Sequence, residues 1–128
     1  MPNVLHWTLV FTPSSLEHLA ERDITADDVA DAVFGFFGPP RIRKFGREQG
    51  LRWLVIAPLE GGELLACLLR QALPRDVRVE GAFVIPATGV PEEPGVLKAS
   101  MRLCVSVRLA SADEVRSYRA WRRQKGGS

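Results

Sequence analysis

Two apolar runs joined by a short turn constrain the fold of this chain more than any other part of it. The first run, LRWLVIAPL at residues 51–59, has apolar side chains at both odd and even positions, which is typical of a central strand. Glu60-Gly61-Gly62 predicts a tight turn, after which Glu63–Gln71 returns as a second apolar segment. Propensity alone would allow a helix there, but the tight turn and the short length favour a strand. The sequence therefore predicts a hairpin at the centre of a sheet.

The other elements follow from the spacing of apolar residues and from the residues that begin and end helices. Pro13 suits the first turn of one helix, Thr25 caps another, and Ser111 with Glu114 forms a capping box. The predicted elements are a strand at Trp7–Thr12, a helix at Pro13–Glu21, a helix capped by Thr25 with an apolar stripe at Val29, Val33, Phe36 and Phe37, a strand at Arg41–Phe45, a turn at Gly46–Gly50, a strand at Met101–Leu109 and a final helix from Ser111.

The strand at Met101–Leu109 alternates more regularly than any other segment. Its odd-numbered residues are apolar, whereas its even-numbered residues are Arg102, Cys104, Ser106 and Arg108. Successive side chains of a strand point to opposite faces of the sheet. Unbroken alternation therefore predicts that Arg102 and Arg108 share one polar face.

Together these elements predict a single α+β domain over residues 1–128. We expect an antiparallel sheet of about four to five strands, with two N-terminal helices and one C-terminal helix packed on one side. Residues 72–100 are rich in proline and glycine. They are interpreted as an insertion with some structure or a flap, because a structureless loop of this length would be unusual. Residues 126–128 are interpreted as a tail.

The composition excludes several classes of protein. No stretch approaches the roughly 18 apolar residues of a membrane span, and the apolar N-terminus lacks the basic region of a signal peptide. A cytoplasmic protein without membrane contact is therefore expected. Cys67 and Cys104 are interpreted as buried free thiols, which could form a disulfide only if their strands were neighbours. The cysteines and histidines lack the spacing of a zinc site, so no metal and no cofactor are expected.

Charge is distributed unevenly along the chain. Residues 1–31 carry six acidic residues and one arginine, whereas residues 41–52 carry five basic residues and one acidic residue. Residues 101–128 carry seven basic and two acidic residues. Arginine binds phosphate and carboxylate groups through a planar fork. The clustering therefore predicts an anionic partner.

Three segments, in this order, resemble one protein family. LEHLAERDITADDVADAV (16–33) is similar to the "His-Ala…Glu-Arg-Gly-Ile-Thr-x-x-Asp-Val" opening of BrnT-type toxins and their uncharacterised relatives. Gly50-Leu-Arg-Trp-Leu-Val-Ile-Ala with the following Gly-Gly resembles their central hairpin, and VSVRLASADEVRSYRAW (105–121) resembles their closing strand and helix. The resemblance omits residues 72–100, and Asp23 stands where the family has glycine. It implies a RelE-like fold.

The resemblance further implies a metal-independent endoribonuclease, the toxin of a type II toxin–antitoxin system, which cleaves RNA by attack of the 2′-hydroxyl. RNA and a cognate antitoxin protein would be its partners. Such cleavage needs a base, an acid and cations on the phosphorane. Arg108 and Tyr118 match family positions, and His18 and Lys44 complete the proposed catalytic set. The expected RNA-binding residues are Arg43, Arg70 and Arg102.

Several alternatives remain open. Arg108 could be a surface arginine paired with an acid, His18 an ordinary exposed histidine, and Tyr118 a core residue. The basic surface could also bind RNA or DNA without catalysis. In a third interpretation the chain is a protein-interaction domain that forms a homodimer through its acidic N-terminal helices. Its acidic partner would bind one sector of the final helix, formed by Arg116, Arg119 and Arg123.

Overall fold

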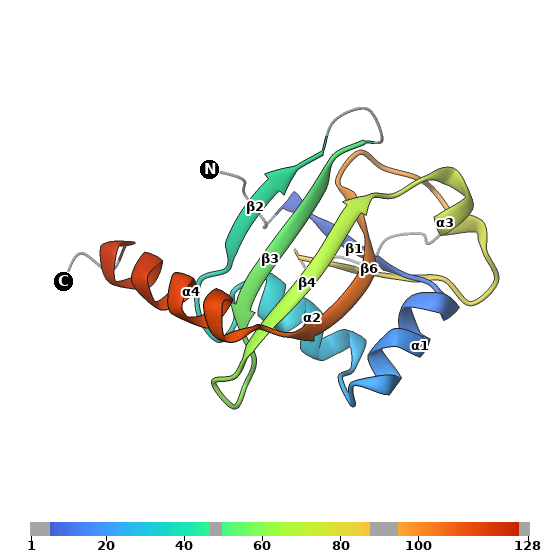
Figure 1. Cartoon of the computed structure of the whole chain (residues 1–128). Coiled ribbons are helices and arrows are strands. Elements are labelled where there is room, and N and C mark those ends of the chain that lie inside the picture. The colour runs from blue at the N-terminus through green and yellow to red at the C-terminus, as the bar shows by residue number, and fades with distance from the viewer. Residues whose placement is uncertain (1–5, 47–49, 88–94, 126–128) are drawn as a thin grey trace.

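The computed structural model of the chain describes residues 6–46, 50–87 and 95–125 (Figure 1). These residues form an α+β domain with six strands and four helices. The elements in chain order are β1 (Thr8–Phe11), α1 (Pro13–Glu21), α2 (Ala26–Val33), β2 (Arg41–Phe45), β3 (Arg52–Pro58), β4 (Leu64–Gln71), α3 (Pro74–Arg78), β5 (Phe83–Pro86), β6 (Met101–Leu109) and α4 (Ala112–Lys125). The predicted tail and most of the predicted turn at 46–50 lie outside the described residues.

The sheet is mixed, with the strand order β2-β3-β4-β6-β1-β5. The predicted hairpin is confirmed, because β3 and β4 pair in antiparallel from Arg52↔Arg70 to Pro58↔Leu64. The prediction of a fully antiparallel sheet is wrong, because β1 lies parallel to β6. The predicted strand number is also too low, because residues 72–100 contribute α3 and an edge strand, β5, which pairs with β1.

Side-chain caps fix where the N-terminal helices begin. The Thr12 hydroxyl accepts a hydrogen bond from the Ser15 amide at 3.2 Å, and Thr25 and Asp28 form a capping box at the start of α2. The prediction that the stripe of α2 extends to Phe37 is wrong. The helix ends at Val33, and Gly35 has a left-handed φ of 82°, which leaves the Phe36 side chain 77% exposed.

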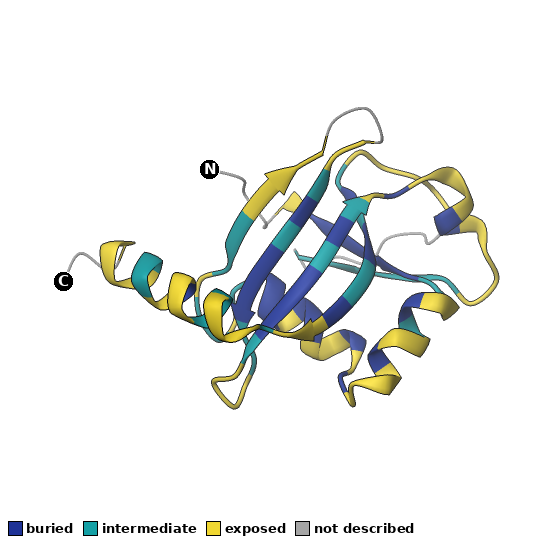
Figure 2. Cartoon of the chain, viewed as in Figure 1, coloured by how far each residue is buried: buried dark blue, intermediate teal, exposed yellow. Residues whose placement is uncertain are grey.

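Helices cover both faces of the sheet, so the prediction of helices on one side only is wrong. On one face of the sheet, which we call the core face, α1 and α2 pack against alternate residues of β3 and β4, including Val55 and Cys67. On the opposite face, Tyr118 of α4 packs on Ile56 and Ala66. A further cluster on that face joins Val77 of α3 to Val10 of β1 and Leu103 of β6. Figure 2 shows that β3 and β4 are buried or half-buried over almost their whole length. The burial of β3 on both faces explains its continuous apolar sequence.

A β-bulge in β6 breaks the alternation that its sequence suggests. Leu69 pairs with Cys104, but the preceding residue of β4, Leu68, pairs with Ser106, so Val105 is an extra residue. As a result, Cys104 and Val107 contact the same core face, although strict alternation would separate them. The prediction that Arg102 and Arg108 share a face is therefore wrong.

The two cysteines lie on neighbouring strands. Cys67 of β4 and Cys104 of β6 are both buried and free, with 4.0 Å between their sulfur atoms. The hydrogen bond with Cys104 and burial raise the pKa of the Cys67 thiol. The prediction of buried free thiols is confirmed.

Among the described residues, none of the helices combines the length and the apolar content needed to cross a membrane.

Candidate functional site

The face that α3 and α4 share is open in its middle. Figure 1 looks onto this face and shows α4 across one corner, α3 at the opposite corner, and β3 and β4 between them. Leu54, Leu68 and Ser106 lie side by side there in register and are half-buried. We call these three residues the open strip. It is an apolar surface with one hydroxyl, within reach of solvent.

Arginines surround the open strip. Arg43 of β2 pairs with Leu54, and Arg52 of β3 pairs with Arg70 of β4, one step further along the same face. On the other side of the strip, Arg108 pairs with Ala66. The sheet register thus places five arginines on one face, namely Arg41, Arg43, Arg52, Arg70 and Arg108.

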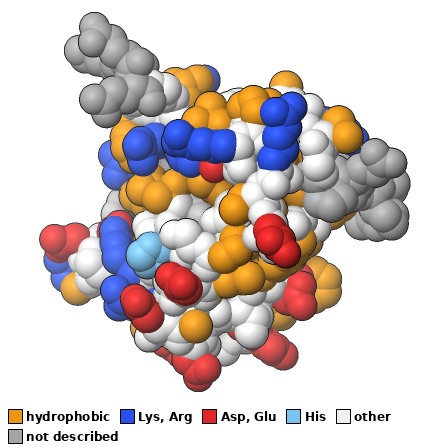
Figure 3. Space-filling view, turned by 90° about the vertical axis from the view of Figure 1, so that its right-hand side faces the viewer, with side chains coloured by type: hydrophobic (Ala, Val, Ile, Leu, Met, Phe, Trp, Pro, Cys, Tyr) orange, Lys and Arg blue, Asp and Glu red, His pale blue; other side chains and the backbone are white. Residues whose placement is uncertain are grey.

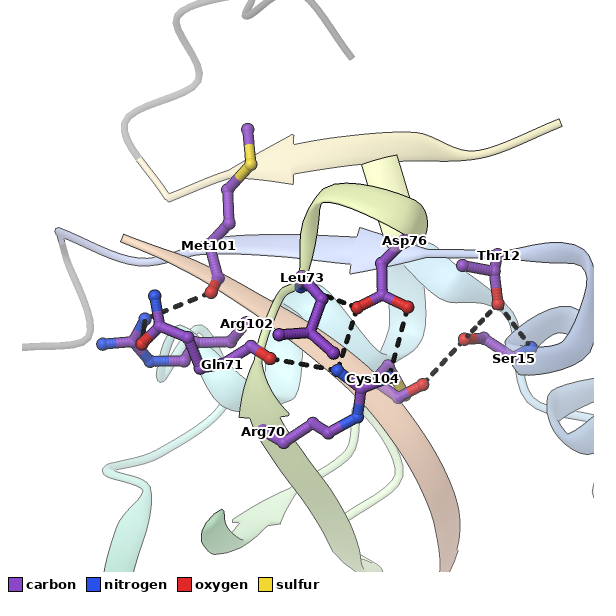
Figure 4. Close-up of polar contacts among 9 residues, drawn as sticks. All are labelled: Thr12, Ser15, Arg70, Gln71, Leu73, Asp76, Met101, Arg102 and Cys104. Carbon is purple, nitrogen blue, oxygen red and sulfur yellow. Dashed lines mark hydrogen bonds and ion pairs between the residues drawn. The ribbon is translucent and has the colours of Figure 1, made fainter. Parts of the chain in front are cut away.

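Two of these arginines are held by carboxylates. Arg70 donates two hydrogen bonds to Asp76, at 2.9 and 3.2 Å, and the same carboxylate accepts the Leu73 amide at the start of α3 (Figure 4). Arg108 forms a bidentate pair with Glu114 of α4. These pairs tie both arginines to helix starts and limit their freedom to meet a ligand.

The other arginines of this face are less constrained. Arg41 donates to the backbone oxygen of Ser117 at 3.2 Å and to its hydroxyl at 2.6 Å, which fastens β2 to α4. Among the described residues, Arg43 and Arg52 have no side-chain partner. Phe45, at the end of β2, lies on the same side and is 48% exposed. Free guanidinium groups beside an exposed ring suit a phosphate and a base.

Glu114 links Arg108 of β6 to the first turn of α4. It accepts hydrogen bonds from Arg108 and from the Ser111 amide, which completes the predicted capping box. The hydrogen bond from Arg108 is the main cause that lowers the pKa of Glu114 to about 2. The alternative of a surface arginine paired with an acid therefore describes Arg108 in this structure.

This pairing predicts a pH-dependent contribution to stability. The folded-state pKa of Glu114 lies below its usual 4.5, so its contribution is complete above that pH and is lost as the pH falls toward 2. Arg108 is 47% exposed and Glu114 is 21% exposed, so solvent screens the pair, and we expect Glu114→Gln to lower the free energy of unfolding by only about 1 kcal/mol near neutral pH. Urea unfolding of both proteins should show this difference shrinking as the pH approaches 2. A difference that stayed constant with pH would contradict the pairing.

The four predicted catalytic residues do not meet. Tyr118 is buried, its hydroxyl donates to the Pro39 carbonyl at 2.7 Å, and burial raises its pKa. Lys44 pairs in register with Trp53, so it lies on the core-face side, away from Arg108. His18 is exposed on α1, the helix that packs against that other face. Tyr118 and Arg108 alone lie on the face of the open strip.

Arg102, predicted to bind RNA, lies on the face opposite Arg43 and Arg70. Its guanidinium lies 4.4 Å from the ring centre of Trp53 and 5.4 Å from that of Trp7. It also donates to the backbone oxygen of Ala99 at 2.7 Å. Burial lowers its pKa. These contacts give Arg102 a role in packing at the edge of the core.

The outer surface of α4 carries the predicted partner-binding arginines. Arg116, Arg119 and Arg123 are all exposed, and Arg116 pairs with Asp113. Arg119 borders a hollow with Leu109, which is 51% exposed. Basic side chains therefore occur on the outer surface of α4 as well as around the open strip. Figure 3 shows a third region, the end that carries α1 and α3, where Lys and Arg side chains gather above Asp and Glu side chains.

A groove between the sheet and α4 was not predicted from the sequence. It has a volume of about 200 Å³ and adjoins the open strip through Leu54. Its apolar lining includes Ile56 and Tyr118, the strand side contributes arginines, and the helix side contributes carboxylates. Arg41 and Arg52 were also missed as residues of this face. Only the strand register, which the sequence does not reveal, brings them to it.

The described residues contain no cluster of three or more histidine, cysteine, aspartate or glutamate side chains that could hold a metal ion. The chain matches no protein-family model, no curated protein and no solved structure.

Proposed function

We propose that the protein binds single-stranded RNA across the open strip. The observation that carries this proposal is a pair of arginines, Arg43 and Arg52, which have no side-chain partner in the described part of the chain. They lie beside a half-buried apolar surface and the exposed ring of Phe45. Single strands bind to basic surfaces through their phosphates and stack their bases on aromatic side chains. The resemblance to BrnT-type toxins supports RNA as the ligand.

Binding of RNA is better supported than cleavage of RNA. Metal-free cleavage needs a base and an acid near the scissile phosphate. On the open face, Glu114 is engaged by Arg108, and the Tyr118 hydroxyl donates to Pro39. His18 and Lys44, the other candidates, lie toward the opposite face. Endoribonuclease activity therefore stays a prediction. Incubation of RNA with the protein in EDTA tests it, and equal RNA decay with the Arg108→Ala variant would remove the catalytic role of Arg108.

The binding proposal predicts that Arg43→Gln and Arg52→Gln each weaken RNA binding about three- to tenfold, because each removes a cation that a phosphate can reach. Fluorescence anisotropy with a labelled single strand of about 12 nucleotides measures this affinity. Each variant should also reduce the slope of log K against log salt by about 0.7, the value for one phosphate contact on a single strand.

Arg22→Gln is the matched control, because it removes the same charge from an exposed position at the end of α1. It should leave the affinity and the salt slope almost unchanged. Equal losses in all three variants would show that the RNA responds only to net charge, and no loss in any of them would place the RNA elsewhere.

A second surface, the outer face of α4, is suited to binding a protein partner. Among the described residues, Arg119 and Arg123 have no side-chain partner, and the hollow beside Arg119 exposes Leu109. We propose that an acidic protein, such as the antitoxin that the resemblance implies, binds this face of α4. Arg119→Gln with Arg123→Gln should then weaken that complex in a pull-down while RNA binding is retained.

A further inference from the structure

We propose that the groove between the sheet and α4 takes a guanine base of the bound RNA, so that the protein prefers strands containing guanine. This inference rests on the proposed RNA binding and deepens it by naming the base. The groove shares Leu54 with the open strip, and it is also lined by Arg43, which pairs with Leu54. A strand whose phosphates contact Arg52, on the same face, can therefore turn one base into the groove beside Arg43.

The size and lining of the groove fit a single flat base. Its volume of about 200 Å³ is below the roughly 300 Å³ or more that is usual for whole small-molecule ligands. Leu54, Ile56 and the ring of Tyr118 supply an apolar surface for the base. Single-stranded RNA is commonly recognised through bases that leave the stack and bind by their edges in this way.

The two sides of the groove carry opposite charges. Arg43 and Arg41 lie on the strand side, and Asp113 and Glu114 lie on the helix side. Guanine presents two adjacent acceptors, O6 and N7, which arginine contacts bidentately. It also presents two adjacent donors, N1–H and the 2-amino group, which match the two oxygens of a carboxylate. Adenine and cytosine each offer one amino group beside a ring acceptor, which a carboxylate would repel.

Asp113 is the carboxylate that can be released to make this contact. Both oxygens of Glu114 already accept hydrogen bonds from Arg108. Asp113 pairs through one oxygen with Arg116, and the two side chains are 87% and 71% exposed. Exposed pairs contribute little stability, so this one can open at low cost. On the arginine side, Arg41 is engaged with Ser117, which leaves Arg43.

The test uses four uridine-rich RNA strands that differ at one central base, which is guanine, inosine, adenine or uracil. We expect the guanine strand to bind about fivefold more tightly than the uracil strand, which is the low end for a bidentate contact because the groove is open. Inosine lacks the 2-amino group and should lose most of this preference. Asp113→Asn should abolish the preference, yet bind the uracil strand at least as well as the wild type, because a negative charge is removed.

Asp27→Asn is the matched control, because Asp27 is also an exposed aspartate in the first turn of a helix, α2, away from the groove. It should keep the guanine preference. Equal affinity of the wild type for all four strands would overturn the guanine assignment while leaving the RNA proposal standing, as would a preference that survives in Asp113→Asn. Failure of every strand to bind would instead overturn the proposed function itself.

Discussion

Replacing Asp76 with alanine should lower the free energy of unfolding by about 3 kcal/mol. The Asp76 carboxylate is only 8% exposed and accepts three hydrogen bonds, two from Arg70 and one from the Leu73 amide. Alanine would leave a partly buried guanidinium without its carboxylate and the first turn of α3 without its acceptor. Removal of one partner from a buried pair commonly costs about 3–5 kcal/mol, and the 23% exposure of Arg70 places this pair at the lower end.

Urea unfolding followed by circular dichroism measures this loss. Asp113→Ala is the control, because its pair with Arg116 is exposed, and it should cost less than about 1 kcal/mol. Asp76→Asn should fall between the two, because an amide oxygen can still accept the Leu73 hydrogen bond. A loss in Asp76→Ala no larger than in Asp113→Ala would show that the Asp76 carboxylate does not hold α3 to the sheet.

Deletion of Val105 and deletion of Val107 from β6 should have different effects on folding, although the alternating sequence does not distinguish the two residues. Cys104 and Ser106 pair with the consecutive residues Leu69 and Leu68, so removal of Val105 leaves every other side chain on its present face. We expect this variant to fold, with a loss of about 1–2 kcal/mol for the missing half-buried side chain. Removal of Val107 would instead bring Arg108 opposite Cys67 in the core, where an unpaired charge is not tolerated.

Circular dichroism and urea unfolding of the two variants provide the comparison. The chain without Val105 should unfold in one cooperative transition, whereas the chain without Val107 should show no cooperative transition. Equal behaviour of the two variants would indicate that β6 has no bulge in solution and that its register differs from the one described here.

Local signals in the sequence predicted most of the elements because their causes lie within a few residues. Thr25 with Asp28 and Ser111 with Glu114 cap helices at a spacing of three, and Gly61 and Gly62 lie in the turn of the central hairpin. The prediction that the apolar stripe continues α2 to Phe37 was wrong, because apolar spacing does not reveal the left-handed Gly35 that follows the end of the helix.

The candidate site was harder to predict because it depends on pairing between distant segments. The single extra residue in β6 moves Arg102 to the opposite face from Arg108, and an alternating sequence gives no sign of it. Arg52 and Arg70 meet only through the β3–β4 register. Arg43 was predicted from its charge, but its place beside the groove depends on how α4 crosses β3. Charge clustering identified the kinds of residue involved, and the register decided which of them lie together.

The position of β1 determines when this domain can be completed during synthesis. Of the six strands of this sheet, β1 is made first, yet its neighbours in the sheet are β5 and β6, which are made last. The β2–β3–β4 meander can form from local contacts alone, whereas β1 must wait for Phe83–Pro86 and Met101–Leu103 to pair with it. Pairing across such a sequence separation is slow to form. Until β5 and β6 have both been made, the apolar residues of β1 lack their partners in the sheet.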